Sequence, residues 1–303
     1  PSALDTVPVD QAVTVRGRTE PDATLTLDGE PLEHDDGEFA VEFEHPPAGA
    51  LRFVAVDPAG NRTEAVTSVP VDYPEDTRAV HVSAAAWRDD ALRTEVLRLV
   101  DEGRVDAVQL DLKDEAGVIG YDSQLAEARR IGAVRPEFDL AEAVEELESR
   151  GVRVIGRIVA FRDPIYAQAA WADGRRDAVL QTPDGDMLGA YGGFANYMDP
   201  EVRQYNIDIA LEAVALGVDD ILWDYVRRPE GHPSTMLVPG LGDGRTTDAI
   251  VDFLHEAHVA LRAQGAYQGA SVFGIAAMSG DSIGQDVPGI ARVVDYIAPM
   301  VYP

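Results

Sequence analysis

The sequence predicts an α/β protein in which a TIM-type (β/α)8 barrel follows a small all-β domain. Two patterns lead to this expectation. From residue 79 onward, short apolar runs alternate with amphipathic helical patterns, which is typical of parallel strands buried on both faces. Before residue 74, short alternating runs follow one another closely and are separated by turn dipeptides, which is typical of antiparallel strands.

The composition indicates a globular protein with a strongly acidic surface. Of the 303 residues 46% are hydrophobic, and 54 acidic residues against 25 basic ones give a formal net charge of −29. Such a surface repels nucleic acid and anionic membranes, and no stretch is long and apolar enough to span a bilayer. The chain contains no cysteine, which excludes disulfides and thiolate sites.

Residues 1–73 form the predicted all-β domain, which we expect to be a sandwich of about seven strands. The dipeptides Asp28-Gly29, Asp36-Gly37 and Gly60-Asn61 supply the positive φ angles that tight turns need. Residues 74–78 are the expected linker. The predicted strands are TVRGRT, ATLTLDGE, GEFAVEFEH, LRFVAVD and TEAVTSVPV.

Residues 79–303 form the predicted barrel domain. Three helices are expected from apolar stripes that begin at Leu92, Val202 and Ile250, and Asp199-Pro200 supplies the N-cap and first residue of the second. A closed barrel needs eight strands, so we expect the chain to be a fragment that lacks about two βα units. The six visible strand patterns are AVHVSAAAW, DAVQLDLK, VRVIGRIVAF, DDILWDYV, ASVFGIAAM and VDYIAPMVY.

Three charged residues interrupt consecutive apolar strands of the barrel domain: Asp111, Arg157 and Asp224. An ionised group in a buried strand costs several kcal/mol unless it is paired. We therefore expect the three side chains to meet at the carboxyl-terminal mouth of the barrel, where enzymes of this fold keep their active sites. The alternative is a structural ion-pair network that fills the barrel.

Five motifs of the barrel domain resemble, in order, a glycoside hydrolase family of TIM-barrel proteins that was formerly a domain of unknown function. They are DLKDEAGVIGYDS, GRIVAFRDP, ILWDYVRRPEG, SIGQD and DYIAPMVYP, and the resemblance runs from Ala79 to Pro303. It implies an amylase-like barrel that cleaves a polysaccharide or oligosaccharide with paired carboxylates. Arg228 and Ser271 depart from the family pattern, which has an aromatic and an acidic residue there.

The N-terminal domain resembles the bacterial immunoglobulin-like modules found beside extracellular enzymes. The stretches GRTEPDATLTLDGEPLEHDDGEFAVEF and FVAVDPAGNRTE carry this resemblance. It implies an extracellular or cell-surface protein in which the module is a spacer or a contact with the cell wall.

Glycoside cleavage needs one protonated and one ionised carboxyl group. Under the family resemblance, Asp224 matches the strand that carries the nucleophile, so we expect it to be the nucleophile, or the base of an inverting enzyme. For the acid, Asp111, Asp286 and a residue beyond Pro303 stay open. Trp223 is expected to face the helices. The predicted substrate contacts are Lys113, Asp114, Arg157, Tyr225, Arg227 and Tyr302.

Lys113 is the single lysine, because every other basic residue of this chain is an arginine or a histidine. Strand alternation places it on the same face as Asp111. We expect its ammonium group to reach Asp111 or a sugar hydroxyl, with chance retention as the alternative. A Schiff-base lysine is disfavoured, since neighbouring carboxylates stabilise the ammonium charge.

The sequence gives less support to a metal-dependent enzyme, to an amidase or to a non-catalytic binding protein. The six histidines show no metal-ligand spacing, so we expect no metal and no cofactor. An amidase acting on cell-wall material would need a nucleophilic serine or a metal site. The main alternative is a non-catalytic carbohydrate-binding or cell-surface assembly protein.

Overall fold

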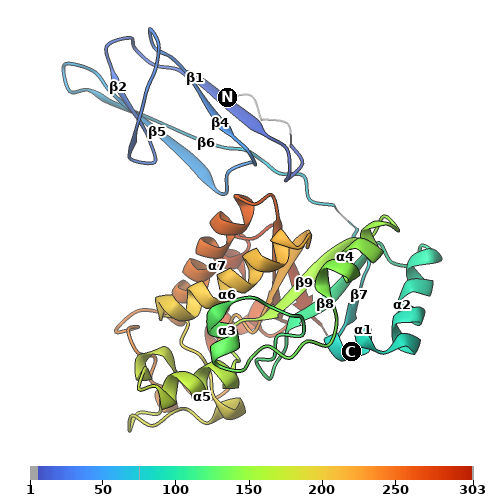
Figure 1. Cartoon of the computed structure of the whole chain (residues 1–303). Coiled ribbons are helices and arrows are strands. Elements are labelled where there is room, and N and C mark those ends of the chain that lie inside the picture. The colour runs from blue at the N-terminus through green and yellow to red at the C-terminus, as the bar shows by residue number, and fades with distance from the viewer. Residues whose placement is uncertain (1–5, 75, 302–303) are drawn as a thin grey trace. The chain divides into compact units, whose positions relative to one another are not determined.

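The computed structural model describes residues 6–74 and 76–301. Tyr302, one of the predicted substrate contacts, lies outside these residues. The described chain forms two compact units (Figure 1). We call them the β unit, mainly residues 6–73, and the barrel unit, mainly residues 76–258 and 267–301.

The β unit contains two antiparallel sheets, with strand orders β1-β4 and β3-β2-β5-β6. Leu25, Leu51 and Phe53 of one sheet form its buried core, against which Phe39 and Val41 of the other sheet pack. Asp28 and Asp36 have the positive φ angles expected of the turns. Within the described residues the strands number six, against the expected seven or so: β1 Val13–Arg18, β2 Thr24–Leu27, β3 Glu30–Leu32, β4 Glu38–Phe43, β5 Ala50–Val56 and β6 Arg62–Ser68.

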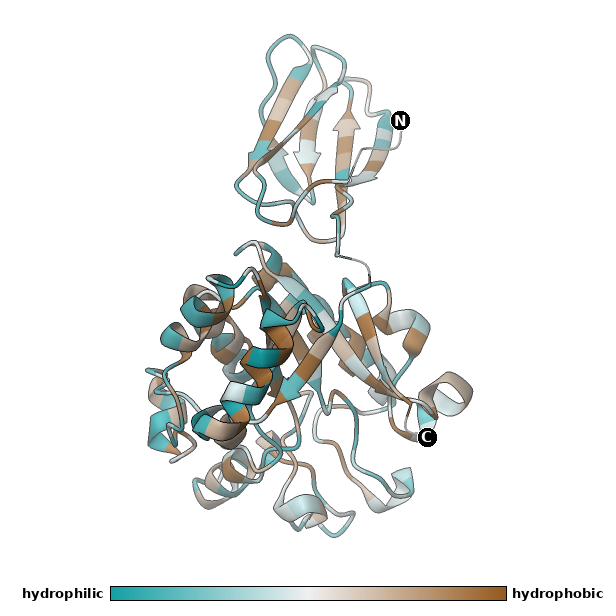
Figure 2. Ribbon diagram, turned by 90° about the vertical axis from the view of Figure 1, so that its right-hand side faces the viewer, coloured by the Kyte–Doolittle hydropathy of each residue, from teal (hydrophilic) through white to brown (hydrophobic). Residues whose placement is uncertain are grey.

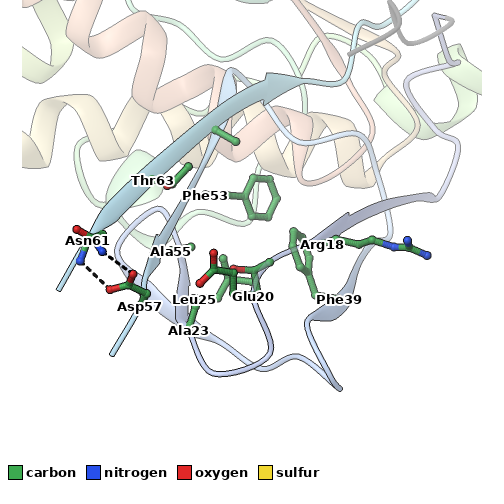
Figure 3. A pocket seen from close by; sticks show the side chains of 12 residues that line it. Arg18, Glu20, Ala23, Leu25, Phe39, Phe53, Ala55, Asp57, Asn61 and Thr63 are labelled. Atoms are coloured by element: carbon green, nitrogen blue, oxygen red, sulfur yellow. Dashed lines mark hydrogen bonds between the residues drawn. The ribbon is translucent and has the colours of Figure 1, made fainter. Parts of the chain in front are cut away.

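One edge of the β-unit core is open to solvent. Thr63 and Ala65 of β6 pair with Ala55 and Phe53 of β5 and face the same side, yet both are exposed. A pocket of about 550 Å³ lies there, and Phe39 stands in it with its ring 5.2 Å from that of Phe53 (Figure 3). The smaller sheet therefore covers only part of the larger one.

The barrel unit is built on six parallel strands in sequential order, from β7 to β12, which form a half-barrel. The strands are β7 Ala79–Val82, β8 Ala107–Lys113, β9 Arg153–Val159, β10 Asp220–Asp224, β11 Tyr267–Phe273 and β12 Tyr296–Met300. On the inner face, Ala107, Ile155 and Leu222 form an apolar cluster with Tyr296 and Ala298. The parallel order and the helical connections agree with the predicted partial TIM barrel.

Helices connect the strands of the barrel unit and cover the sheet (Figure 1). Brown hydrophobic bands recur along the strands in Figure 2 and are interrupted by teal and white ones. The α-helices are α1 Ala84–Arg88, α2 Asp90–Asp101, α3 Ala126–Arg130, α4 Leu140–Glu148, α5 Pro164–Ala172, α6 Pro200–Ala215, α7 Thr246–Arg262, α8 Ala276–Ser279 and α9 Val287–Ile290. The short 3-10 helices are η1 Arg176–Ala178, η2 Ala190–Gly192, η3 Pro233–Thr235 and η4 Gly280–Ser282.

The helix predictions are largely confirmed. Asp199 caps α6 by accepting hydrogen bonds from two backbone amides, and Pro200 is its first residue. Trp223 of β10 faces the helices, with its ring 5.1 Å from that of Phe253 in α7. The apolar stripe expected to begin at Leu92 falls on α2, but Leu92 itself is half exposed, so the prediction is wrong at this residue.

A β-bulge in β8 separates Asp111 from Lys113. Asp111 pairs with Arg157 of β9, but Lys113 pairs with the next residue, Ile158, so Leu112 is an extra residue. The bulge interrupts strand alternation. Asp111 therefore shares the inner face with Arg157, whereas Lys113 turns toward the helices. The prediction that Lys113 reaches Asp111 or a sugar hydroxyl is wrong for this reason.

The Lys113 side chain is completely buried and joins β8 to its neighbours. Its Nζ lies 2.9 Å from Asp163 Oδ2, 2.7 Å from Asn206 Oδ1 of α6 and 3.2 Å from the carbonyl oxygen of Ala160. An ammonium group has three donors on one compact atom, and three acceptors converge on it here. This match accounts for a lysine in a chain whose other side-chain cations are arginine and histidine.

Lys113→Arg should lower the free energy of unfolding of the barrel unit by about 1–3 kcal/mol, because a larger planar guanidinium overpacks this site. Lys113→Met should cost more, about 3–5 kcal/mol, since it leaves the buried Asp163 carboxylate without its cation. Urea unfolding measured by tryptophan fluorescence tests both variants, because every tryptophan of the sequence lies in the barrel unit.

Arg98→Lys is the matched control, since Arg98 forms exposed ion pairs on α2. It should change the free energy of unfolding by less than about 0.5 kcal/mol. If Lys113→Arg is as stable as this control, the three-acceptor explanation is wrong.

Candidate functional site

Arg157 of β9 lies at the centre of a buried charge cluster that joins three consecutive strands. Its Nη1 is 2.8 Å from Asp111 Oδ1 of β8. Its Nε and Nη2 are 3.0 and 2.7 Å from Asp224 Oδ2 of β10. The three side chains are only 6–8% exposed. The structure thus brings together the three charged residues singled out from the strand patterns.

Two residues that sequence reasoning missed complete the cluster. Glu115, two residues after β8, forms an ion pair with Arg157 Nη2, and its side chain is 38% exposed. His81 of β7 places Nε2 2.7 Å from Asp111 Oδ1, and its side chain is 49% exposed. His81 was detectable as a polar residue between Val80 and Val82 in the first strand. Glu115 had no comparable signal, because it lies in an acidic loop.

Asp111 is held in its ionised form. Burial acts to raise its pKa, but the hydrogen bond from His81 and the charge of Arg157 outweigh burial, so the pKa lies below its ordinary value of 3.8. Arg157 responds in the opposite sense: burial acts to lower its pKa, but Asp224 and Asp111 raise it above the ordinary value. Asp111 is therefore poorly suited to the role of general acid, which requires a proton at neutral pH.

Asp224 is the last residue of β10 and is fixed at both oxygens. Oδ2 accepts the two bonds from Arg157, and Oδ1 accepts a bond of 2.7 Å from the backbone amide of Tyr225. Tyr225 has a φ of 53°, which is unusual for a residue with a bulky side chain. This turn directs the backbone amide of Tyr225 to the carboxylate and orients it.

Aromatic rings and guanidinium groups alternate beside Asp224. Arg162 lies 4.4 Å from the ring centre of Tyr191 and 5.0 Å from that of Tyr225, and its Nη1 donates to the Tyr225 hydroxyl at 2.7 Å. Arg227 lies 4.6 Å from the rings of both Tyr225 and Phe273. Tyr191 is 38% exposed. Both guanidinium groups therefore lie within cation–π distance of the Tyr225 ring.

Two of the predicted substrate contacts have structural roles. Arg227 is fully buried, and it donates to the Arg228 carbonyl oxygen and to Glu230. Asp114 Oδ1 accepts hydrogen bonds from the backbone amides of Ala116 and Val118, and these bonds close the loop after β8. The prediction that Arg227 contacts a sugar is wrong, because its packing against aromatic rings excludes it from the surface.

The structure does not join Asp286 to the charge cluster. Asp286 directly precedes α9, and the ion pairs of Arg157 within the described residues are with Asp111, Glu115 and Asp224. Gln285, the neighbour of Asp286, joins the segment after β10 to β11 by donating to the carbonyl oxygens of Val226 and Ser271. Asp286 is thus near the ends of these strands, but outside the cluster.

The two positions that depart from the family pattern are both buried. Arg228 donates to the carbonyl oxygens of Gly231 and Ser282 and holds loops together. Ser271 follows Ala270, which pairs with Trp223, so it stands beside Asp224 in the sheet. The residues of β11, YQGASVF, therefore place a hydroxyl and not a carboxylate next to Asp224.

The described residues contain no group of histidine, aspartate and glutamate side chains arranged to hold a metal ion. Among the same residues, no helix has the length and hydrophobicity needed to cross a membrane.

Comparison with known proteins identifies the barrel unit. A family model described as "putative glycosyl hydrolase domain" matches residues 79–303. A hypothetical protein from Ruminiclostridium thermocellum is 23% identical with a TM-score of 0.53, over 63% of this chain and 96% of that one. The PgaB (BpsB) glycoside hydrolase domain from Bordetella bronchiseptica is 15% identical with a TM-score of 0.55, over 74% of each chain. These likenesses show the fold, and no curated protein matches the sequence.

Asp111→Asn should make the free energy of unfolding of the barrel unit depend less steeply on pH under acidic conditions. Because the folded-state pKa of Asp111 lies below 3.8, its contribution is fully present above about pH 4 and is lost as the pH falls through the folded-state value. One such group adds at most about 1.4 kcal/mol per pH unit to the slope. Urea unfolding at several pH values between about 3 and 6 measures this slope.

Asp252→Asn, at an exposed position of α7, provides the control and should keep the wild-type slope. An equal slope in the Asp111 variant and in the wild type would show that Asp111 does not titrate as described.

Proposed function

Because the chain belongs to the family described as "putative glycosyl hydrolase domain", we propose that the barrel unit hydrolyses a glycosidic bond of a polysaccharide or oligosaccharide. The proposed site is the charge cluster around Arg157. The observation that carries the proposal is the pair of buried carboxylates, Asp111 and Asp224, held on one guanidinium at the carboxyl ends of β8 and β10. Enzymes of this fold place catalytic residues at such strand ends.

Asp224 is the proposed nucleophile, or the base if the reaction inverts the anomeric centre. It is the last residue of its strand, whereas Asp111 lies two residues inside β8, so Asp224 is nearer to the mouth. Arg157 and the amide of Tyr225 orient its carboxylate before substrate binds, which lowers the cost of reaching the reactive geometry. Asp111 then serves to position Arg157.

The exposed groups around the cluster are the proposed sugar contacts. Glu115 and Tyr191 are each 38% exposed. Arg157 joins Glu115 to Asp224, and the Tyr191 ring lies 6.3 Å from the ring of the partly exposed Tyr225. Carboxylates bond to sugar hydroxyls, and aromatic faces stack on pyranose rings. We further propose that the protein acts outside the cell or at its surface, with the β unit as an accessory module.

A non-catalytic carbohydrate-binding protein is the second candidate. The observation in its favour is that Asp111, Glu115 and Asp224 all contact the same guanidinium. Such an arrangement also serves as an ion-pair core without chemistry. Turnover, measured directly, separates the two candidates.

Asp224→Asn should lower kcat about 10²–10⁴-fold on a polysaccharide that the wild type degrades, because the amide cannot act as nucleophile or base. The substitution keeps the size and the acceptor oxygen of the side chain, so the fold should persist. A reducing-end assay over a panel of neutral, amino-sugar and acidic polysaccharides identifies the substrate. NMR of the first-formed anomer then shows whether Asp224 acts as nucleophile or as base.

Asp219→Asn is the matched control. Asp219 immediately precedes β10 and lies about 16 Å along the strand from Asp224. Its carboxylate accepts a hydrogen bond from the backbone amide of Val154. The control should keep wild-type activity. Wild-type turnover by the Asp224 variant would rule out the proposed role, and binding of a polysaccharide without turnover by the wild type would favour the second candidate.

A further inference from the structure

The charge cluster around Arg157 contains no carboxylate that is placed as a proton donor. Asp111, Asp224 and Glu115 all contact the guanidinium of Arg157. A carboxylate that accepts bonds from a guanidinium presents acceptor oxygens. Departure of a sugar alkoxide needs the reverse, a group that carries a proton and releases it.

His81 is the titratable group of the described cluster that does not contact Arg157. Its Nε2 lies 2.7 Å from Asp111 Oδ1, and its side chain is 49% exposed. We propose that His81 is the general acid of this site, with Asp111 as its positioning residue. This inference rests on the proposed glycosidase function and names the proton donor that the function lacks.

The hydrogen bond to Asp111 sets the orientation of the imidazole ring. Because Nε2 is engaged, Nδ1 is the nitrogen left to meet a substrate. Asp111 accepts two bonds at the same oxygen, from His81 and from Arg157 Nη1. Any shift of Arg157 therefore also shifts His81, so the proton donor and Asp224 are held by one connected network.

The strand order places the donor opposite the nucleophile. His81 is on β7 and Asp224 on β10, and β8 and β9 lie between them. At the usual strand spacing the two backbones are about 14 Å apart across the strands, and the register adds an offset of about 13 Å along them, because His81 is level with Asp220. His81 contacts Asp111, and Asp224 contacts Arg157, so the bonded pair of Asp111 and Arg157 forms the base of the site between them. A sugar on this base has His81 at one side and Asp224 at the other.

The reaction balances with these groups. As the glycosidic bond breaks, its electron pair goes to the leaving oxygen, which takes the Nδ1 proton of the imidazolium. Asp224 attacks the anomeric carbon, or takes a proton from the water that attacks it. In the first case, water then releases the sugar from Asp224 and returns its proton to His81. In the second case, Asp224 releases the proton it took from water to solvent, and solvent reprotonates the imidazole.

The test compares good and poor leaving groups. Phenyl and 2,4-dinitrophenyl glycosides of glucose, galactose, mannose and N-acetylglucosamine, in both anomers, are the probes. A poor leaving group such as phenolate needs protonation, whereas 2,4-dinitrophenolate departs without it. His81→Gln should reduce kcat/KM for the phenyl glycoside about 10²–10⁴-fold, and for the dinitrophenyl glycoside less than about tenfold.

Glutamine is chosen because its amide can still donate to Asp111 while carrying no transferable proton. Activity on the dinitrophenyl glycoside reports that the variant is folded. If His81→Gln fails to fold, His81→Asn is measured in the same way. Equal losses on both glycosides would mean that His81 has only a structural role and would overturn the proposal.

Glu115→Gln is the matched comparison, since Glu115 is the exposed carboxylate of the cluster. It should affect both glycosides alike. If Glu115→Gln selectively loses the phenyl glycoside and His81→Gln does not, Glu115 is the acid and the proposal fails. Asp224→Asn should lose both substrates, and a wild type inactive on every probe and polysaccharide would overturn the glycosidase function itself.

Discussion

The ion pairs of one guanidinium organise the mouth of the half-barrel. Arg157 is buried inside a parallel sheet, where an unpaired charge would cost several kcal/mol. Asp111 on one neighbouring strand and Asp224 on the other compensate it, and each carboxylate depends on the same cation in return. Below this polar layer the inner face is apolar, with Ala107, Ile155 and Leu222 in contact. The Arg157 layer lies toward the end where the fold keeps its active sites, and a separate ion pair, Arg153 with Asp220, lies at the first residues of β9 and β10.

The buried ion pair of Lys113 and Asp163 lies on the opposite face of the same sheet. The bulge at Leu112 lets β8 send Asp111 inward and Lys113 outward, although an unbroken strand would put both on one side. Lys113 then connects β8 to Asp163, which caps α5, and to Asn206 of α6. One strand therefore supports both the charge cluster and the helices behind it. The two ionic centres have different requirements: a planar fork that bridges two carboxylates inside, and a compact three-donor atom outside.

The site combines rigid and accessible parts. The buried residues Asp111, Arg157 and Asp224 form the rigid layer, and every charged group there has a partner. His81 and Glu115 extend from this layer toward solvent. An arrangement of this kind orients exposed groups through buried ones, which is how enzymes limit the reorganisation that accompanies reaction.

Sequence patterns alone determined the two-part organisation, the six parallel strands and the meeting of Asp111, Arg157 and Asp224. These predictions succeed because burial imposes apolar runs, and because isolated charges in such runs must pair. The direction of Lys113, the burial of Arg227 and the positions of His81 and Glu115 were decided only by the tertiary structure. A one-residue bulge reverses strand alternation, and aromatic packing removes a guanidinium from solvent. Neither event leaves a periodic signal in the chain, since each depends on residues that are distant in sequence.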